Sequence, residues 1–276
     1  MRTISSTDAI ALVAHGPVGH GPDVLFAHAS GFHGLVWTPL ASRLGDRFCC
    51  WSLDFRGHGL SFAPDGHDFD WRGFRDDVHA ATYGLALDKP IGVGHSKGGA
   101  ALLMAELARP GTFRGLYLYE PIVLPPEAAT RGGGNPIADG ARRRRASFAS
   151  RDEAYANYSA KPPLSALHHE ALRAYVDHGF LDGLDGRVHL ACRPEHEAKV
   201  FEMSRSHDTW KELGSIGCPV VIAGGGDGDR PGELAPAIAE QIPGARLEVF
   251  RDLGHLGPLE DPDRLAAAIG AFGASM

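Results

Sequence analysis

The pentapeptide Gly94-His95-Ser96-Lys97-Gly98 constrains the fold of this chain more than any other segment. A short apolar run at 90–93 precedes it, and an alanine- and leucine-rich segment at 100–108 follows it. This order predicts a strand, a sharp turn and a helix, with Ser96 at the turn. A Cβ on either flanking glycine would clash with the neighbouring strand or helix. The strained turn would lift the Ser96 hydroxyl out of the sheet, next to the positive end of the helix.

Short apolar segments alternate with helical patterns along most of the chain. Because this alternation is typical of a mostly parallel sheet flanked by helices, the sequence predicts an α/β fold. We expect strands at 10–14, 24–28, 48–53, 91–94, 115–119, 220–223 and 247–250, and the pattern is compatible with an extra edge strand near 2–5. Helices are expected at 71–85, 97–108, 233–241 and 261–272.

The alternation stops between Pro121 and Leu213. Helical patterns replace it, with Asn135 and Ser150 as N-cap residues. Roughly ninety residues are too many for an ordinary loop between two strands. We therefore predict a helical lid over the carboxyl ends of the strands, where ligands bind in such sheets. The predicted division is a core of 1–121 and 213–276 with a lid of 122–212.

Composition and short motifs argue against several classes of protein. The chain of 276 residues has a formal net charge of −7, whereas nucleic-acid binders normally present a basic surface. Its four cysteines have no C-x-x-C spacing, which favours free thiols in a reducing compartment. Neither a signal peptide nor a membrane span is visible. We expect a cytoplasmic monomer or homodimer that acts on a small-molecule acyl substrate, without nucleic-acid or membrane partners and without metal or cofactor.

A serine, an acid and a histidine each follow a predicted strand, in the order Ser96, Asp227, His255 along the chain. A serine hydroxyl needs an adjacent base at neutral pH, and an imidazole can take its proton and return it to a leaving group. A carboxylate would fix the tautomer of His255 and stabilise the imidazolium. Asp227 is our prediction for this acid. Asp229, two residues on, and Glu120, at the end of an earlier strand, remain open as alternatives.

Several ordered motifs give the chain a resemblance to the α/β-hydrolase superfamily, specifically its lidded esterase, perhydrolase and C–C hydrolase branch. They are His28-Ala29-Ser30-Gly31, 54–61, 94–98, 224–231 and Gly254-His255. The resemblance implies an α/β-hydrolase fold with Ser96 as nucleophile, Asp227 as acid and His255 as base. It also implies an oxyanion hole formed by the backbone N–H groups of Ser30 and Lys97.

Serine at position 96, where the haloalkane dehalogenases and epoxide hydrolases have aspartate, argues against those two branches. The resemblance instead implies a serine hydrolase that cleaves a carboxylic ester, lactone or thioester. A C–C bond hydrolase or a cofactor-free perhydrolase or haloperoxidase would use the same triad and remains an alternative, as does a non-catalytic hydrolase-like binding protein. We expect a largely apolar substrate pocket. Its candidate substrate-binding residues are Phe32, Phe148, Tyr155 and Tyr158.

Two charged features fall outside this scheme. Lys97 stands where the family commonly has an apolar residue. We expect its side chain to reach a nearby carboxylate, with assistance to an anionic substrate as the alternative. The four residues 142–145 are all arginine. Because successive helical residues are about 100° apart, the four cannot share one face. We expect most of them to be solvated, with one inward arginine that meets a substrate carboxylate as the alternative.

Overall fold

An eight-stranded sheet forms the centre of the chain in this computed structural model, which describes residues 1–126, 135–226 and 230–276. The strand order is β1-β2-β4-β3-β5-β6-β10-β11. The strands are β1 (Arg2–Ser5), β2 (Ala11–Val18), β3 (Asp23–Ala27), β4 (Cys49–Asp54), β5 (Ile91–His95), β6 (Gly115–Tyr119), β10 (Val220–Gly225) and β11 (Arg246–Phe250). The pairs from β4 to β11 are parallel, while β2 pairs antiparallel with β1 and β4. The predicted mostly parallel fold is confirmed.

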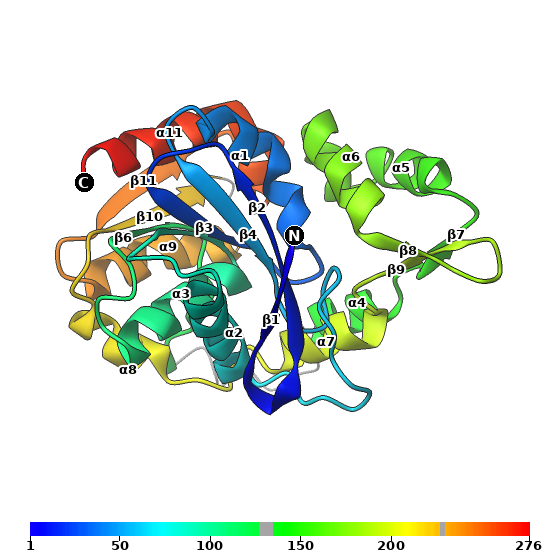
Figure 1. Cartoon of the computed structure of the whole chain (residues 1–276), viewed down its shortest axis with the longest axis horizontal. Helices are drawn as coiled ribbons and strands as arrows, with labels where there is room; N and C mark the ends of the chain where they lie inside the picture. The colour runs from blue at the N-terminus through cyan, green and yellow to red at the C-terminus, as the bar shows by residue number, and fades with distance from the viewer. Residues whose placement is uncertain (127–134, 227–229) are drawn as a thin grey trace.

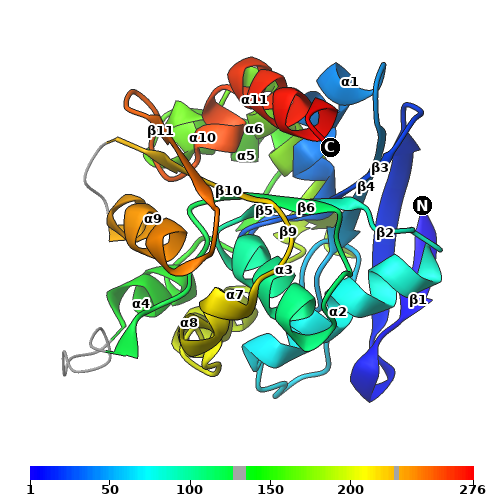
Figure 2. The same ribbon diagram turned by 90° about the vertical axis from the view of Figure 1, so that its left-hand side faces the viewer.

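Helices cover both faces of the sheet (Figure 2). One face packs against α2 (Trp71–Gly84), α3 (Lys97–Ala108) and α9 (Arg230–Gln241), and the other against α1 (Thr38–Leu44) and α11 (Pro262–Ala274). A short helix, α10 (Gly257–Glu260), precedes α11. Along β3 the side chains alternate, because Leu25 and Ala27 join one hydrophobic cluster while Val24 and Phe26 join the other. The sheet is therefore buried on both faces.

The register places the turn after β5 in the middle of the carboxyl edge. Gly94 lies opposite Ala27 of β3 and Leu118 of β6. His95, the last residue of β5, lies opposite Tyr119, the last residue of β6. Because parallel strands end at the same edge, the residues that follow β3, β5, β6 and β10 gather around Ser96.

The segment 122–212, called the insertion below, joins β6 to β10. Its elements are α4 (Pro136–Arg142), β7 (Ser147–Phe148), α5 (Arg151–Ser159), α6 (His169–His178), β8 (Phe180–Asp182), β9 (Val188–Leu190), α7 (Pro194–Glu202) and α8 (Thr209–Glu212). Asn135 and Ser150 cap α4 and α5, as expected. The insertion is not purely helical, since β7, β9 and β8 form a second sheet in that order. This small sheet and α5 lie to one side of the main sheet (Figure 1).

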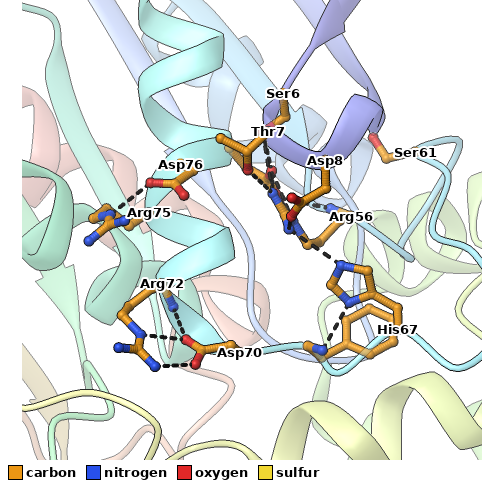
Figure 3. A network of polar contacts seen from close by, with 12 residues as sticks. Ser6, Thr7, Asp8, Arg56, Ser61, His67, Asp70, Arg72, Arg75 and Asp76 are labelled. Carbon is orange, nitrogen blue, oxygen red and sulfur yellow. Dashed lines mark hydrogen bonds and ion pairs between the residues drawn. The ribbon is translucent and has the colours of Figure 1, made fainter.

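A buried ion pair anchors the loop that follows β4. The guanidinium of Arg56 is 1% exposed and lies 2.7 Å from the carboxylate of Asp77 on α2. Its Nη2 also donates to the hydroxyls of Ser6 and Thr7, at 3.3 and 3.1 Å (Figure 3). The salt bridge therefore ties the loop to α2, and the two hydroxyl contacts tie it to the N-terminal segment.

Within the described ranges, no helix is long and apolar enough to cross a membrane. The same residues contain no group of three or more histidine, cysteine or acidic side chains that could hold a metal ion. All four cysteines are free thiols.

Candidate active site

Ser96 occupies a strained turn between β5 and α3. Its φ is 55° and its ψ is −119°, a conformation that costs a non-glycine residue about 1–3 kcal/mol. The flanking glycines allow the close packing of this turn. A Cβ on Gly94 would lie 2.6 Å from Cα of Gly99, and one on Gly98 would lie 2.1 Å from the carbonyl oxygen of Ala27. The turn therefore has the backbone geometry predicted from the pentapeptide.

His255 is hydrogen-bonded to Glu120. The ring Nδ1 lies 2.6 Å from Oε2 of Glu120, whose side chain is fully buried directly after β6. The second oxygen, Oε1, accepts a hydrogen bond of 2.7 Å from the backbone N–H of Gly225. With Nδ1–H donated to a carboxylate, Nε2 is the unprotonated nitrogen of the neutral ring. This is the tautomer that a general base needs.

Of the three candidate acids, the structure brings Glu120 to His255. Asp227, our sequence-based prediction, lies outside the described residues, as does Asp229. The two strands that precede these candidates, β6 and β10, are parallel neighbours in the sheet. Glu120 has a φ of 44°. It is therefore a second residue with a positive φ at the carboxyl edge of the sheet, in addition to Ser96.

Two side chains from strand ends hold the loop that carries His255. Nε2 of His95 donates to the carbonyl oxygen of His255 at 2.7 Å, and the two rings lie 4.9 Å apart. The hydroxyl of Tyr119 donates to the carbonyl oxygen of Gly254 at 2.8 Å. Neither contact was predicted from the sequence. The available signal was the position of each residue at the end of a predicted strand next to a candidate catalytic residue.

Ser30 and Lys97 are the two residues whose backbone N–H groups were predicted to form the oxyanion hole. Ser30 is 8% exposed and follows β3, which pairs directly with β5. Lys97 is the first residue of α3. These positions are compatible with the oxyanion-hole role predicted for their backbone N–H groups.

The side chain of Lys97 does not reach a carboxylate. Its Nζ is buried and has no hydrogen-bond partner among the described residues. It lies 4.1 Å from the ring centroids of both Phe55 and Phe74. The expectation of a carboxylate partner is wrong, because the side chain extends into an aromatic part of the interior between the loop after β4 and helix α2.

Arg144 is the inward-facing member of the arginine run. Its guanidinium forms an ion pair with Glu197 of α7 and donates to the hydroxyl groups of Tyr175 and Tyr158. The other three arginines are exposed. The expectation that most of the run is solvated therefore fits the structure.

The Arg144–Glu197 pair lies against the loop that follows β3. A Cβ on Gly31 would lie 2.3 Å from Oε1 of Glu197 and 3.2 Å from Nη1 of Arg144. Gly31 directly follows Ser30, the predicted oxyanion donor. The insertion thus presents an ion pair and two phenol groups next to this donor, rather than the apolar lining that we expected.

The four predicted substrate-binding side chains have different positions. Phe32 is half-buried, with its ring 5.2 Å from that of Tyr175, and Tyr158 contacts Arg144. Phe148 is fully buried within the insertion and has no surface for a substrate. Tyr155 packs within the insertion below the guanidinium of Arg173, at 5.4 Å.

A cavity of about 230 Å³ lies elsewhere, where the insertion meets the core. Its lining includes His15, His33 and His178, but none of Ser96, Glu120 and His255. This cavity is separate from the candidate site.

Comparison with known proteins gives matches over most of the chain. The model of the "Alpha/beta hydrolase family" matches residues 24–268. The 2-(acetamidomethylene)succinate hydrolase of Mesorhizobium japonicum is 36% identical over 102 residues, which cover 37% of this chain and 36% of that relative. The N-formylmaleamate deformylase of Pseudomonas putida is 27% identical over 243 residues, which cover 86% of this chain and 83% of the relative. A crystal structure of E-2-(acetamidomethylene)succinate hydrolase has the same fold, with a TM-score of 0.81, 23% identity and 99% coverage of both chains.

Proposed function

The chain belongs to the α/β-hydrolase family, and on this basis we propose that it is a serine hydrolase with a Ser96–His255–Glu120 triad. The observation that carries the proposal is the hydrogen bond of 2.6 Å from Nδ1 of His255 to the buried carboxylate of Glu120. Together with the strained turn at Ser96, it supplies a nucleophile, a base in the required tautomer and an acid that orients the base. Glu120 takes the role that the sequence suggested for Asp227.

The reaction would proceed through an acyl-enzyme. His255 takes the proton of Ser96 through Nε2 while Oγ attacks the acyl carbon of the substrate. The backbone N–H groups of Ser30 and Lys97 would bind the resulting oxyanion. His255 then gives the proton to the leaving group as the scissile bond breaks. A water molecule gives a proton to Nε2 of His255 and attacks the acyl carbon of the acyl-enzyme. His255 returns that proton to Oγ of Ser96 as the bond to the acyl carbon breaks and the acid is released.

We propose a carboxylate-bearing acyl compound as the substrate. Arg144 can offer up to five N–H donors in a planar fork, and its present partners leave donors for an anion. The pair that it forms with Glu197 lies against Gly31, next to the proposed oxyanion donor. Two relatives, a 2-(acetamidomethylene)succinate hydrolase and an N-formylmaleamate deformylase, are also named for carboxylate compounds.

The bond cleaved would be that of a carboxylic ester, lactone or thioester. An amide is the second candidate, since those same relatives are named for an acetamido and an N-formyl compound. C–C bond cleavage and perhydrolase chemistry would use the same triad. Turnover of matched ester, amide and diketone substrates would separate these reactions.

Labelling with a fluorophosphonate probe tests the nucleophile. We expect the probe to modify the wild-type chain at Ser96 and to leave the Ser96→Ala variant unmodified. Ester hydrolysis should fall at least about 10³-fold in that variant, since triad members act as a unit. A folded Ser96→Ala variant with wild-type turnover would exclude the proposed mechanism.

Two substrates of similar length test the anion site: the p-nitrophenyl hemiester of glutarate and p-nitrophenyl valerate. Arg144→Gln should lower kcat/KM for the hemiester by about 10–100-fold, the scale of a charged hydrogen bond. Glu197→Gln, which removes a competing carboxylate, should raise it. Arg145→Gln changes an exposed arginine of the same run and is the matched control. Equal effects of Arg144→Gln on both substrates would contradict the carboxylate proposal.

A further inference from the structure

Lys97, the residue that follows the proposed nucleophile Ser96 in the sequence, has a buried side chain. The Lys97 side chain is fully covered, and its Nζ lies 4.1 Å from the ring centroids of Phe55 and Phe74. No hydrogen-bond partner for Nζ exists among the described residues. Two aromatic faces are the surroundings that favour a cation. Burying a charge without a hydrogen bond costs free energy, so a lysine at this position destabilises the fold relative to an apolar side chain.

The neighbours of Lys97 do not neutralise it near neutral pH. Two histidines lie close, His28 from the loop after β3 and His58 from the loop after β4, and burial lowers the pKa of each well below the ordinary histidine value. Burial raises the pKa of the Cys192 thiol, which faces Lys97 from the insertion. These three groups are therefore uncharged at neutral pH.

The remaining charged neighbours are Arg56 and Asp77, which act on Lys97 from the loop after β4 and from α2. They form a buried ion pair with a separation of 2.7 Å, so their opposite charges largely cancel at Lys97. Burial lowers the pKa of Lys97 itself to about 7. Among Lys97 and these described neighbours, it is thus Lys97 whose charge changes near neutral pH.

We propose that the Lys97 ammonium is an electrostatic positioning element of the oxyanion hole. The proposal rests on the serine-hydrolase function inferred above. The backbone N–H that would bind the oxyanion and the ammonium belong to the same residue, so the charge lies no more than one side-chain length from that N–H. Inside a protein the low dielectric strengthens such an interaction compared with water. The charge acts on the intermediate rather than on the neutral substrate, so it should affect kcat more than KM.

This arrangement implies a fall of activity on the alkaline side of the pH profile. Lys97 loses its proton as the pH rises through about 7, and the oxyanion then loses a nearby positive charge. A neutral side chain at position 97 should abolish this alkaline fall.

The decisive experiment compares pH profiles of kcat and KM for the wild type and Lys97→Met, which keeps the length of the side chain and removes its charge. We expect kcat to fall about 10-fold below neutral pH, KM to stay nearly constant and the alkaline flank to disappear. Lys89→Met, at an exposed lysine just before β5, is the matched control and should keep the wild-type profile. An alkaline flank that persists in Lys97→Met overturns the proposal.

A second variant tests the proposal even if Lys97→Met does not fold. Phe74→Leu removes one aromatic face from the ammonium and leaves Lys97 in place. It should move the alkaline flank to lower pH, because the charged form loses part of its stabilisation. An unmoved flank in this variant also contradicts the proposal.

Fluorophosphonate labelling distinguishes this inference from the proposed function. If the wild type is not labelled at Ser96, the proposed serine-hydrolase mechanism fails. If both the wild type and Lys97→Met are labelled and share one pH profile, the mechanism stands and the role of Lys97 is refuted.

Discussion

Oε2 of Glu120 and Nδ1 of His255 lie 2.6 Å apart, although 135 positions separate the two residues in the sequence. The contact is possible because β6, which ends just before Glu120, lies between β5 and β10 in the sheet. The proposed acid therefore comes from the strand next to that of the proposed nucleophile, and the backbone N–H of Gly225 on the following strand donates to its carboxylate.

Replacement of Glu120 by glutamine should nearly abolish activity. The amide would let the ring of His255 take the wrong tautomer, and we expect kcat to fall about 10³–10⁴-fold. Steady-state kinetics on an activated ester measure the loss. Asp227→Asn is the comparison, and its effect should be far smaller. A larger loss in Asp227→Asn than in Glu120→Gln would return the role of the acid to Asp227.

Tyr119→Phe should weaken the hold on the His255 loop without removing any group of the triad. The hydroxyl donates to the carbonyl oxygen of Gly254 at 2.8 Å, and a hydrogen bond of this kind contributes about 0.5–1.5 kcal/mol. We expect a kcat reduced by about 3–10-fold with labelling of Ser96 retained. An unchanged kcat would show that His95 and Glu120 suffice to place the loop.

Gly98→Ala should prevent correct folding of the turn, because its Cβ would lie 2.1 Å from the carbonyl oxygen of Ala27. Gly140→Ala is a matched control in helix α4, where a Cβ would meet nothing within 4 Å. The control should gain about 0.5–1 kcal/mol in unfolding free energy. Soluble yield and denaturant unfolding, measured for both variants, report the folding and the stability of each. A Gly98→Ala variant of wild-type stability and activity would contradict the close packing of α3 on β3.

Asp77→Asn should lower the unfolding free energy by about 3–5 kcal/mol, because it leaves the buried guanidinium of Arg56 without its counter-ion. Asp76→Asn affects the neighbouring, partly exposed pair with Arg75, where we expect about 0–1 kcal/mol. Urea unfolding of the two variants provides the measurement. Similar losses would mean that the buried pair is not the anchor of the loop after β4.

Lys97→Met should raise thermal stability at neutral pH. An amine in an unfolded chain has a pKa of about 10.4, whereas burial lowers that of Lys97 to about 7. The cost of burying the ammonium is therefore complete below pH 7 and decreases as the pH rises toward the unfolded value. The gain in Tm should shrink over the same range. A gain that is independent of pH would show that packing, not charge, is responsible.

The parts of the fold that depend on local pattern were predictable from the sequence. The glycines around Ser96 and the alternation of strands and helices were sufficient for the core, and Asn135 and Ser150 marked two helix starts. The small sheet in the insertion was missed because its strands, such as Ser147–Phe148, are only two or three residues long. Such segments are too short to show a period of two.

The parts of the site that depend on tertiary contacts were not predictable. Glu120 and Asp227 both follow strands that end at the same edge, and sequence alone does not show which side chain meets His255. The burial of Lys97 was missed because charge normally indicates exposure. Arg144 could not be distinguished from its three neighbours, since helix α4 ends at Arg142 and the direction of each following side chain depends on how the turn after the helix packs.

The insertion leaves the sheet after β6 and returns to β10, its immediate neighbour. One contiguous stretch of gene could therefore be exchanged by recombination without interrupting any strand pairing of the main sheet. The two junctions are not equivalent, because Glu120 lies at the first and no proposed catalytic residue lies at the second. Crossovers close to Leu213 should be tolerated in evolution or in the laboratory, whereas a crossover that displaces Pro121 would endanger catalysis itself.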